Sequence, residues 1–371
     1  MHRFEREDQP FTSNFFKFGL ANIAMKIQVN ARNRAYDFVA DADEKILHAG
    51  LRNHVDLPYE CSTGTCGTCK AKLITGEIDD AWPDAPGHKY VKAEQNEFLM
   101  CQCVARTDCA IEVADFVYMS NPNAYEPTSF KGRISKTKLC THDVMFLEVV
   151  LEEAMDFDAG QFIVMSVPNV PGSRAYSMVN FERKTSRLDL LIKRKPAGGM
   201  SEWLFTSDRK NVVVDLIGPF GHATFDPHVA QNILCIAGGS GIAGMMSILS
   251  RAVQERYFDQ YKGYLFFGVR TAKDLFFTDE LSQFRNAFPD GLEIVVALSE
   301  GDIPISAEKD FPALALTKGL VHEVASKYMQ GKYKNTRAYL AGPPLAVDAS
   351  IRMLIVDAKL TTDNIVYDKF S

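Results

Sequence analysis

Four cysteines constrain this chain more than any other feature of its sequence. Cys61, Cys66 and Cys69 lie in the segment Cys-Ser-Thr-Gly-Thr-Cys-Gly-Thr-Cys, and Cys101 follows further along the chain. The glycines of that segment can adopt positive φ angles without strain, so the backbone can wrap closely around a bound group. Its N–H groups can then point toward the sulfur atoms. The segment is therefore predicted to be a tight metal-binding loop.

The spacing C-x4-C-x2-C with a distant fourth cysteine is the plant-type ligand set for a [2Fe–2S] cluster. We therefore predict Cys61, Cys66, Cys69 and Cys101 as the cluster ligands. A zinc site that uses Cys103 in place of Cys61 is an alternative, but it leaves Cys61 without a role and the interleaved glycines unexplained. A disulfide framework is disfavoured because nothing marks the chain as secreted.

Length and composition indicate a soluble protein with several domains. With 371 residues the chain can form two or three domains, each with its own core. Its 46% hydrophobic and 24% charged residues are ordinary for a globular protein. No apolar run approaches the roughly 18 residues that a membrane span requires. Cysteines without a secretion signal indicate a reducing, cytoplasmic compartment. The cysteines outside the ligand set are expected to be small buried apolar residues: Cys103, Cys109, Cys140 and Cys235.

The net charge of −6 gives no reason to expect a nucleic-acid partner, but the charge is unevenly distributed. Between Met25 and Tyr118 there are 15 Asp and Glu residues against 10 Lys and Arg residues. Most of the excess negative charge therefore surrounds the cysteine loop. It forms either an ordinary solvated face or a docking surface that steers a basic partner toward the cluster.

The first predicted domain covers residues 25–118. Residues 1–24 are expected to be an N-terminal extension, because the first strand-like alternation begins at Met25. Strands are predicted over residues 26–30, 35–41, 70–77 and 109–114, with a helix over 44–53. This is a small β-grasp-like arrangement. Together with the cysteine motif, it resembles a plant-type ferredoxin domain, which implies a [2Fe–2S] cluster in the loop.

The second predicted domain covers residues 129–227, after a linker over 119–128 that is polar, contains two prolines and lacks periodicity. Its short β-rich runs, separated by turn signals, are typical of a closed antiparallel β-barrel. Arg174-Ala-Tyr-Ser lies on a predicted strand, whose alternation sends Arg174 and Tyr176 to one face and Ser177 to the other. A glycine-rich turn at 198–199 opens a helix whose free N–H groups can bind an anion.

These two motifs together resemble the FAD-binding barrel of the ferredoxin–NADP reductase superfamily. The resemblance implies that Arg174 and the backbone N–H groups of residues 198–201 hold the flavin pyrophosphate. Tyr176 would stack on the isoalloxazine ring, and Ser177 would approach its N5 atom. The predicted FAD contacts are Arg174, Ala175, Tyr176, Ser177, Ile192, Lys193, Gly198, Gly199, Met200, Ser201 and Phe370.

The third predicted domain covers residues 228–371, where strands and helices alternate as in a parallel α/β sheet with helices on both faces. The apolar strand over 233–237 leads into Gly-Gly-Ser-Gly at 238–241 and then into an amphipathic helix. That order is typical of a phosphate-binding turn. The next strand ends in Arg270, where the Rossmann dinucleotide fingerprint has an acidic residue. We therefore reject that fingerprint here.

These signals, with Ala-Gly-Pro-Pro at 341–344 and Asp-Lys-Phe at 368–370, resemble the pyridine-nucleotide domain of the same superfamily. The NAD contacts that the resemblance implies are Gly238, Gly239, Ser240, Gly241, Arg270, Gly342 and Pro343. Ala341 replaces a cysteine that relatives carry beside the nicotinamide. Phe370 would shield the flavin and yield its position to the nicotinamide. The predicted catalytic residues are Tyr176, Ser177, Asp368 and Phe370.

The order of the three domains resembles the reductase components of bacterial multicomponent oxygenases. Residues 81–87 and Cys-Gln-Cys at 101–103 look most like those of toluene and xylene monooxygenase reductases. The resemblance implies a chain that oxidises NADH, takes hydride on FAD and passes single electrons through the [2Fe–2S] cluster. The acceptor would be a terminal oxygenase for aromatic or hydrocarbon hydroxylation, or its ferredoxin, docking at the acidic ferredoxin domain.

Several alternatives stay open at this point. NADPH could replace NADH, because Arg270 could pair with a 2′-phosphate. The acceptor could be a haem protein or a soluble ferredoxin. The chain could also be a non-catalytic redox-sensing module with vestigial nucleotide sites, although the intact motifs at 174–177 and 238–241 argue against this.

Overall fold

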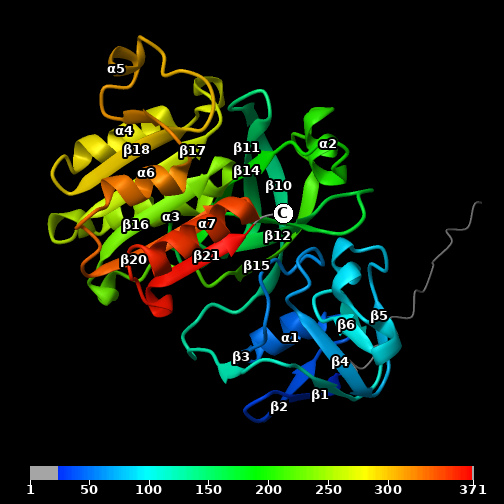
Figure 1. The fold of residues 1–371 in the computed structure, drawn as a ribbon. Helices are drawn as coiled ribbons and strands as arrows, with labels where there is room; N and C mark the ends of the chain where they lie inside the picture. Colours follow the sequence, from blue (N-terminus) through cyan, green and yellow to red (C-terminus); the bar gives the residue numbers. More distant parts are fainter. Residues whose placement is uncertain (1–23, 370–371) are drawn as a thin grey trace, which may run out of the picture.

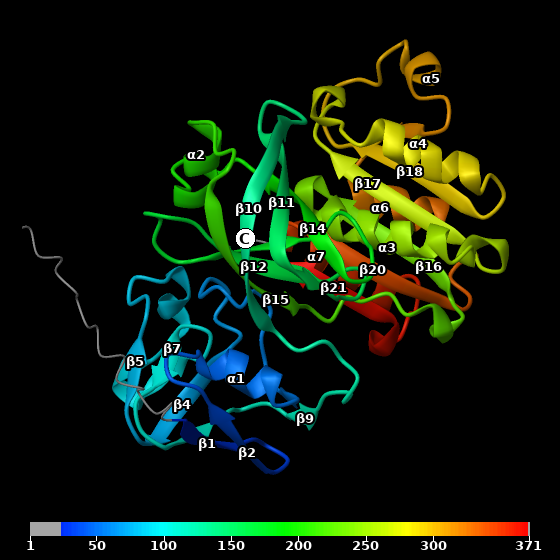
Figure 2. The same ribbon diagram turned by 180° about the vertical axis from the view of Figure 1, so that it is seen from behind.

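An antiparallel barrel lies between two other units, a small β-grasp sheet and a parallel α/β sheet, in both views of the ribbon (Figures 1 and 2). The structure is a computed structural model and describes residues 24–369. It therefore includes only residue 24 of the predicted N-terminal extension, and Phe370 lies outside the described residues. In the part of the chain that is described, no helix is long and apolar enough to cross a membrane.

The β-grasp unit is a five-stranded sheet with one helix. Its strand order is β2-β1-β8-β4-β6, and only the pair β1–β8 is parallel. The strands are β1 (Met25–Asn30), β2 (Ala35–Ala40), β4 (Lys70–Thr75), β6 (Glu97–Leu99) and β8 (Cys109–Glu112), and the helix is α1 (Ile46–Arg52). Ile27 and Val29 in β1 are buried between exposed neighbours, as the alternation predicts.

Two short strand pairs complete this unit. β5 (Ile78–Asp80) pairs with β7 (Cys103–Ala105), and β3 (Val55–Asp56) pairs with β9 (Tyr118–Met119). The segment 119–128, predicted as a linker, therefore begins inside β9 and ends at the first residue of β10 (Thr128–Leu139). Both ends of the segment are held by strand hydrogen bonds.

The barrel unit is a six-stranded antiparallel sheet with the order β13-β12-β15-β10-β11-β14. An isolated bridge between Met178 and Leu190 joins its two edges, so the sheet closes into the predicted barrel. The strands after β10 are β11 (Val144–Met155), β12 (Phe162–Ser166), β13 (Arg174–Ser177), β14 (Thr185–Lys193) and β15 (Val213–Phe220), and α2 (Gly199–Phe205) follows β14. Alternating residues such as Leu147 and Val149 in β11 are fully buried.

The α/β unit is a six-stranded, wholly parallel sheet with the order β19-β18-β17-β16-β20-β21. Its strands are β16 (Asn232–Gly238), β17 (Gly263–Val269), β18 (Leu292–Leu298), β19 (Ala315–Lys318), β20 (Thr336–Gly342) and β21 (Ile365–Lys369). Its helices are α3 (Ile242–Gln254), α4 (Thr278–Ala287), α5 (Ala307–Asp310), α6 (Val321–Tyr328) and α7 (Pro344–Val356). Leu234 and Ile236 of β16 pack with α6 and α7, whereas Ile233 and Cys235 pack with α3. Because both faces are covered, β16 is a continuous apolar run.

Buried contacts join the barrel to both of its neighbours. Phe162 and Phe220 of the barrel belong to the same buried cluster as the core of the β-grasp unit, and their ring centroids are 5.8 Å apart. On the other side, Arg251 of α3 donates hydrogen bonds to Asp158 Oδ1 at 3.0 Å and to the Phe225 carbonyl at 2.9 Å. The three units therefore pack as one body.

Gly160 lies at the junction of the barrel and the α/β unit, so a substitution at this position tests the packing between them. Its φ is +103°, and a Cβ there would lie 2.1 Å from the Ala223 carbonyl oxygen. We expect Gly160→Ala to lower the thermal unfolding midpoint clearly, because backbone strain of about 1–3 kcal/mol adds to a clash that requires backbone movement. Gly331→Ala is the matched control, since φ is +77° there but no atom lies within 4 Å of the added Cβ. Equal midpoints for the two variants in calorimetry would contradict the close approach at Gly160.

Candidate functional site

The four predicted cluster ligands lie together in one cage of sulfur atoms. Cys69 Sγ and Cys101 Sγ are 3.1 Å apart, and a hydrogen bond from Cys66 lowers the pKa of the Cys61 thiol. Cys61, Cys69 and Cys101 are buried, whereas Cys66 is half-buried and is the ligand nearest to solvent. An all-sulfur donor set of this kind fits an iron–sulfur cluster.

The loop around this cage has the backbone that its glycines predict. Gly64 has φ of +76° and Gly67 has φ of +80°. The Thr63 N–H group donates to Cys61 Sγ at 3.4 Å, and the Gln102 side-chain amide donates to Cys101 Sγ at 3.4 Å. Hydrogen bonds to the sulfurs stabilise thiolates and tune a bound cluster.

The strand β13 holds the predicted flavin residues next to α3. Ser177 is buried, and its Oγ has no hydrogen-bond partner among the described residues. A Cβ at Gly244 of α3 would lie 3.7 Å from that Oγ, so Ser177 lies between the barrel and the α/β unit. Leaving a buried hydroxyl without a hydrogen-bond partner costs about 1–3 kcal/mol. The unpaired Ser177 hydroxyl therefore fits a site where a bound ligand supplies the partner.

Arg174 and the start of α2 form the predicted phosphate-binding part of the same site. The Arg174 guanidinium is half-buried and donates to the Ser173 carbonyl at 2.8 Å. At α2, Ser201 Oγ accepts from the Lys195 N–H group at 3.0 Å and can donate to the Gly198 carbonyl at 3.2 Å. The Ser201 hydroxyl therefore holds the turn that presents the helix N-terminus.

Three further predicted flavin contacts separate into two groups. Ile192 and Met200 are buried in the barrel core, so their side chains stabilise the fold around the site. Lys193, in contrast, extends toward the α/β unit, where its Nζ pairs with Asp143 at 3.4 Å and would lie 3.9 Å from a Cβ at Gly239. Its ammonium group lines the cavity described next, and the contact of Lys193 with the flavin stays a prediction.

A cavity of about 260 Å³ lies at the carboxyl ends of the parallel strands, where strand order reverses between β16 and β20. Ligands of open α/β sheets bind at this edge. Its lining includes Gly238, Gly239, Arg270 and Pro343 of the predicted set. Gly241 does not line it but packs on β20, where a Cβ would lie 2.5 Å from the Ala341 carbonyl oxygen.

Gly342 has φ of +146°, and a Cβ there would lie 3.0 Å from the Gly238 nitrogen. Glycines 238, 241 and 342 therefore allow the ends of β16 and β20 and the start of α3 to meet without side chains between them. This leaves the backbone open to a bound phosphate.

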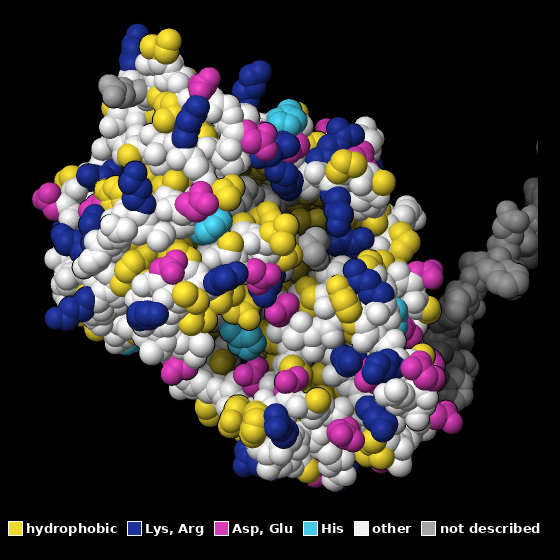
Figure 3. Space-filling model, viewed as in Figure 1, with side chains coloured by type: hydrophobic (Ala, Val, Ile, Leu, Met, Phe, Trp, Pro, Cys, Tyr) yellow, Lys and Arg dark blue, Asp and Glu magenta, His cyan; other side chains and the backbone are white. Residues whose placement is uncertain are grey.

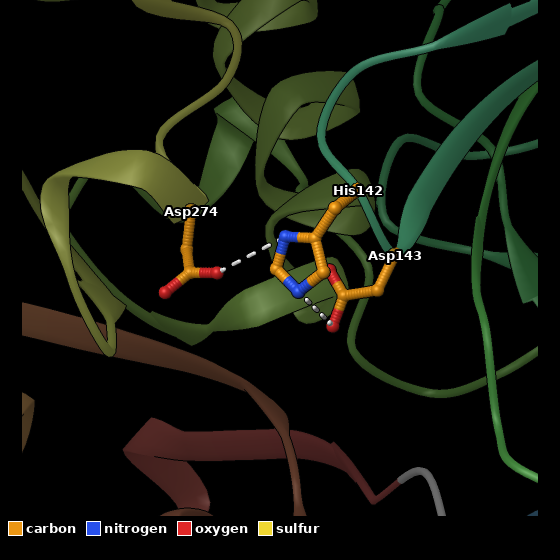
Figure 4. Close-up of side chains that lie close together, drawn as sticks. All are labelled: His142, Asp143 and Asp274. Atoms are coloured by element: carbon orange, nitrogen blue, oxygen red, sulfur yellow. Dashed lines mark ion pairs between the residues drawn. The ribbon is translucent and has the colours of Figure 1, made fainter.

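Charged side chains from the barrel and the α/β unit meet at this cavity (Figure 4). His142 lies between Asp143 and Asp274, with Nε2 3.8 Å from the first carboxylate and Nδ1 3.8 Å from the second. Arg270 Nη2 lies 3.7 Å from Asp143 and 3.8 Å from Asp274. The Thr271 N–H and hydroxyl groups both donate to Asp274 at 2.9 Å, and hydrogen bonding and the nearby cations lower its pKa despite partial burial. The Asp274 carboxylate is therefore ionised near neutral pH.

Asp368 lies near the end of β21, paired in register with Ala341 of β20. Burial raises the pKa of Asp368 to about 7, and the negative charge of Glu60 acts in the same direction. Glu60 immediately precedes Cys61, so the last strand of the chain approaches the cysteine loop. Phe370, predicted beside the flavin, lies outside the described residues.

Sequence reasoning missed the residues that join the cysteine loop to the barrel. His48 Nε2 lies 2.9 Å from Ser62 Oγ, and its ring centroid is 5.1 Å from that of Phe220. The Tyr59 hydroxyl accepts a hydrogen bond from the Gly221 N–H group at 2.9 Å. Burial lowers the pKa of His48 to about 3, so the ring is neutral. The one available signal is that His48 lies on the buried face of α1, where a polar residue is unusual.

The cage, the flavin strand and the nucleotide cavity together define an NAD(P)H-dependent flavin and iron–sulfur oxidoreductase. Family profiles match the chain in the same order. A 2Fe-2S iron-sulfur cluster binding domain matches residues 29–106, an oxidoreductase FAD-binding domain matches 131–225, and an oxidoreductase NAD-binding domain matches 235–350. The cofactors are therefore a [2Fe–2S] cluster, FAD and a nicotinamide dinucleotide.

Relatives match over nearly the whole chain. It is 32% identical to a ferredoxin–NAD(P)(+) reductase of Metapseudomonas resinovorans, over 88% of this chain and 94% of that protein. It is 29% identical to the xylene/toluene monooxygenase electron transfer component of Pseudomonas putida, over 88% of this chain and 89% of that protein. The solved ferredoxin reductase in carbazole 1,9a-dioxygenase superposes with a TM-score of 0.78 at 29% identity, covering 94% of this chain and 99% of that one.

The chain belongs to the family of three-domain [2Fe–2S]/FAD/NAD(P)H reductase components of bacterial multicomponent oxygenases. This membership confirms the predicted fold class and sets aside the zinc and the non-catalytic alternatives.

The proposed ligand set predicts that substitutions of Cys66 and of Cys103 have different effects on the cluster. We expect Cys66→Ser to remove the visible absorption and the electron paramagnetic resonance signal of the reduced cluster, because one of four thiolates is lost. Cys103→Ser is the matched control, since Cys103 is buried in β7 and lies outside the proposed ligand set. If Cys103→Ser loses the cluster and Cys66→Ser retains it, the ligand set is wrong.

Proposed function

We propose that this chain transfers electrons from NADH, one at a time, to a terminal oxygenase or to the ferredoxin that serves it. The proposed reaction of that oxygenase is hydroxylation of an aromatic or other hydrocarbon. The names of relatives support this, since they include components of alkene, xylene/toluene, phenol and propane monooxygenase systems. Four cysteines outside the proposed ligand set form no disulfide within the described residues, which supports a reducing, cytoplasmic setting: Cys103, Cys109, Cys140 and Cys235.

The observation that carries the proposal is a continuous series of contacts from the cysteine loop to the nucleotide unit. Ser62, next to Cys61, contacts His48, whose ring packs on Phe220. Phe220 stacks on Phe162, which pairs in register with Ser177, and Ser177 faces Gly244 of α3, where an added Cβ would lie 3.7 Å from its Oγ. A single packed body therefore links the three sites, as a relay of electrons requires.

We assign the cluster to Cys61, Cys66, Cys69 and Cys101, and the nicotinamide dinucleotide to the cavity at the ends of β16, β17 and β20. Residues 238–240 and 343 would hold its phosphates, and Gly241 and Gly342 would let the backbone turn closely there. Arg270 would hold its ribose end, and Lys193 is added to this site. When bound, the flavin accepts two electrons from the nicotinamide and releases them singly to the cluster.

We assign the flavin to residues 174–177 and 198–201. Arg174 would neutralise its phosphates, and Ser177 Oγ would donate the hydrogen bond that it lacks within the described protein. Asp368 can hold or release a proton at its carboxyl oxygen near neutral pH, because its pKa is about 7. We retain the division into domains at 25–118, 129–227 and 228–371.

The charged side chains at the cavity favour NADH over NADPH. Arg270 is the cation that a 2′-phosphate would approach, but Asp143 and Asp274 already lie within 3.8 Å of its guanidinium. A 2′-phosphate would enter between two carboxylates, and like charges at such separations repel. A 2′-hydroxyl can instead donate a hydrogen bond to a carboxylate.

We propose that the acceptor protein docks on the β-grasp unit near Cys66, where the cage comes closest to solvent. Thr68 is exposed there, and Tyr90, which covers Gly67, is 51% exposed. Some of the acidic side chains of this unit are paired locally, since Arg106 pairs with both Asp43 and Asp79. On the face shown in Figure 3, positive and negative side chains are interspersed over this unit. On that face, electrostatic steering would therefore be local.

One alternative acceptor, a soluble ferredoxin, has specific support. The Metapseudomonas relative is named as a ferredoxin reductase, as is the alkene monooxygenase component of Xanthobacter autotrophicus, which is 30% identical over 91% of this chain. A soluble ferredoxin is therefore the second candidate acceptor. Cross-linking of the reduced protein to each candidate separates the two.

The test is anaerobic stopped-flow mixing with NADH or NADPH, followed at flavin and cluster wavelengths. We expect NADH to reduce both centres and NADPH to react more slowly. Asp143→Asn should improve the rate with NADPH relative to NADH by about 2- to 5-fold, the scale of one exposed ion-pair interaction.

Asp259→Asn is the matched control, because it removes a carboxylate that pairs with Arg256 outside the cavity lining, and it should leave the ratio unchanged. A native preference for NADPH would contradict the choice of dinucleotide. Failure of both dinucleotides to reduce a protein that contains flavin and cluster would contradict the electron-transfer function itself.

A further inference from the structure

Trp82 of the β-grasp unit reaches across to the barrel and contacts the flavin-binding segment. Its backbone N–H donates to Asp80 Oδ1 at 2.8 Å, directly after β5. The Arg174 guanidinium carbon lies 5.2 Å from the centroid of the indole ring. Gly172 has φ of +71°, and a Cβ there would lie 2.4 Å from the Trp82 ring. The ring therefore lies close enough to Gly172 to exclude any side chain at this position.

The loop that carries Trp82 is also tied to the sulfur cage. The Ala81 N–H group donates to the Gln102 carbonyl at 3.0 Å, and Gln102 follows Cys101. The Gly87 N–H group donates to the Gly64 carbonyl at 2.7 Å, and Gly64 lies between Cys61 and Cys66. One short loop thus connects both parts of the cage to the barrel.

The surroundings of Arg174 are those of an anion-binding side chain. Within residues 24–369 it forms no ion pair, and its hydrogen bond goes to the Ser173 carbonyl. The hydroxyl of Ser173 is buried, with 5% of the residue exposed, and has no partner in the described chain. This orphan donor beside the guanidinium is a second, independent sign of a ligand. An aromatic ring behind an arginine favours the cation and limits its motion.

We propose that Trp82 is a positioning residue for FAD. It holds the Arg174 guanidinium in place, so the iron–sulfur unit contributes to the flavin site of its neighbour. Flavin affinity then depends on the docked iron–sulfur unit, and by linkage a bound flavin strengthens that docking. This inference rests on the proposed role of Arg174 as a ligand of the flavin phosphates.

The test uses the full-length, cluster-containing protein, stripped of flavin and titrated with FAD, with flavin fluorescence as the readout. We expect Trp82→Leu to weaken FAD binding by roughly 3- to 30-fold, the range of a cation–π contact. Trp82→Phe should restore part of the loss. Phe116→Leu is the matched control, because Phe116 forms a cation–π contact with Arg32 at the same 5.2 Å distance but is 55% exposed. It should bind FAD normally.

A double-mutant cycle with Arg174→Gln identifies the mechanism, because two residues that act as a unit are not additive. In the Arg174→Gln background, Trp82→Leu should have little further effect. Full additivity would mean that Trp82 acts only through general packing, and normal FAD affinity of Trp82→Leu would also overturn the inference. If Arg174→Gln itself binds FAD normally, the proposed role of Arg174 as a ligand of the flavin phosphates is wrong, whatever the effect of Trp82→Leu. The cluster absorption of each variant verifies that the iron–sulfur unit is intact.

Discussion

The packing of Phe220 between two units is the contact on which the rest of this structure depends. Phe220 ends the barrel strand β15, yet it is buried in the same apolar cluster as the β-grasp core. It packs on His48 on one side and on Phe162 on the other. Burying an aromatic side chain of this size contributes about 1.5–3 kcal/mol, and the neighbouring contacts add to it. The cysteine loop is therefore fixed against the barrel by packing and not only by the linker between the two units.

Hydrogen bonds make this contact specific as well as apolar. Tyr59 accepts from the Gly221 N–H group, and His48 shares a hydrogen bond with Ser62 beside the first cysteine. Each bond satisfies a polar group that the interface buries, which avoids the cost of leaving it unpaired. The neutral state of His48 fits the same setting, since burial and the nearby positive charge of Lys45 both disfavour a charged ring.

Local chemistry explains how much of the protein could be predicted from its sequence. The cysteine spacing, the glycines at 64 and 67 and the alternation around Arg174 act within a few residues, so each site could be found from the sequence. The strand periods likewise predict the three sheets. The contacts of His48 with Phe220 and of Trp82 with Arg174 join segments far apart in the chain and carry no local pattern. Lys193 illustrates the same limit, because its strand was predicted correctly but the direction of its side chain depends on Asp143 of a distant turn.

Single-turnover kinetics of Phe220→Leu measure whether the barrel interface fixes the cluster relative to the flavin. The variant is mixed anaerobically with NADH, and flavin and cluster absorbance are followed separately. We expect flavin reduction at the native rate, followed by slower reduction of the cluster, because only the iron–sulfur unit loses its support. Native rates for both steps, in a variant whose interface packing is measurably weakened, would contradict it.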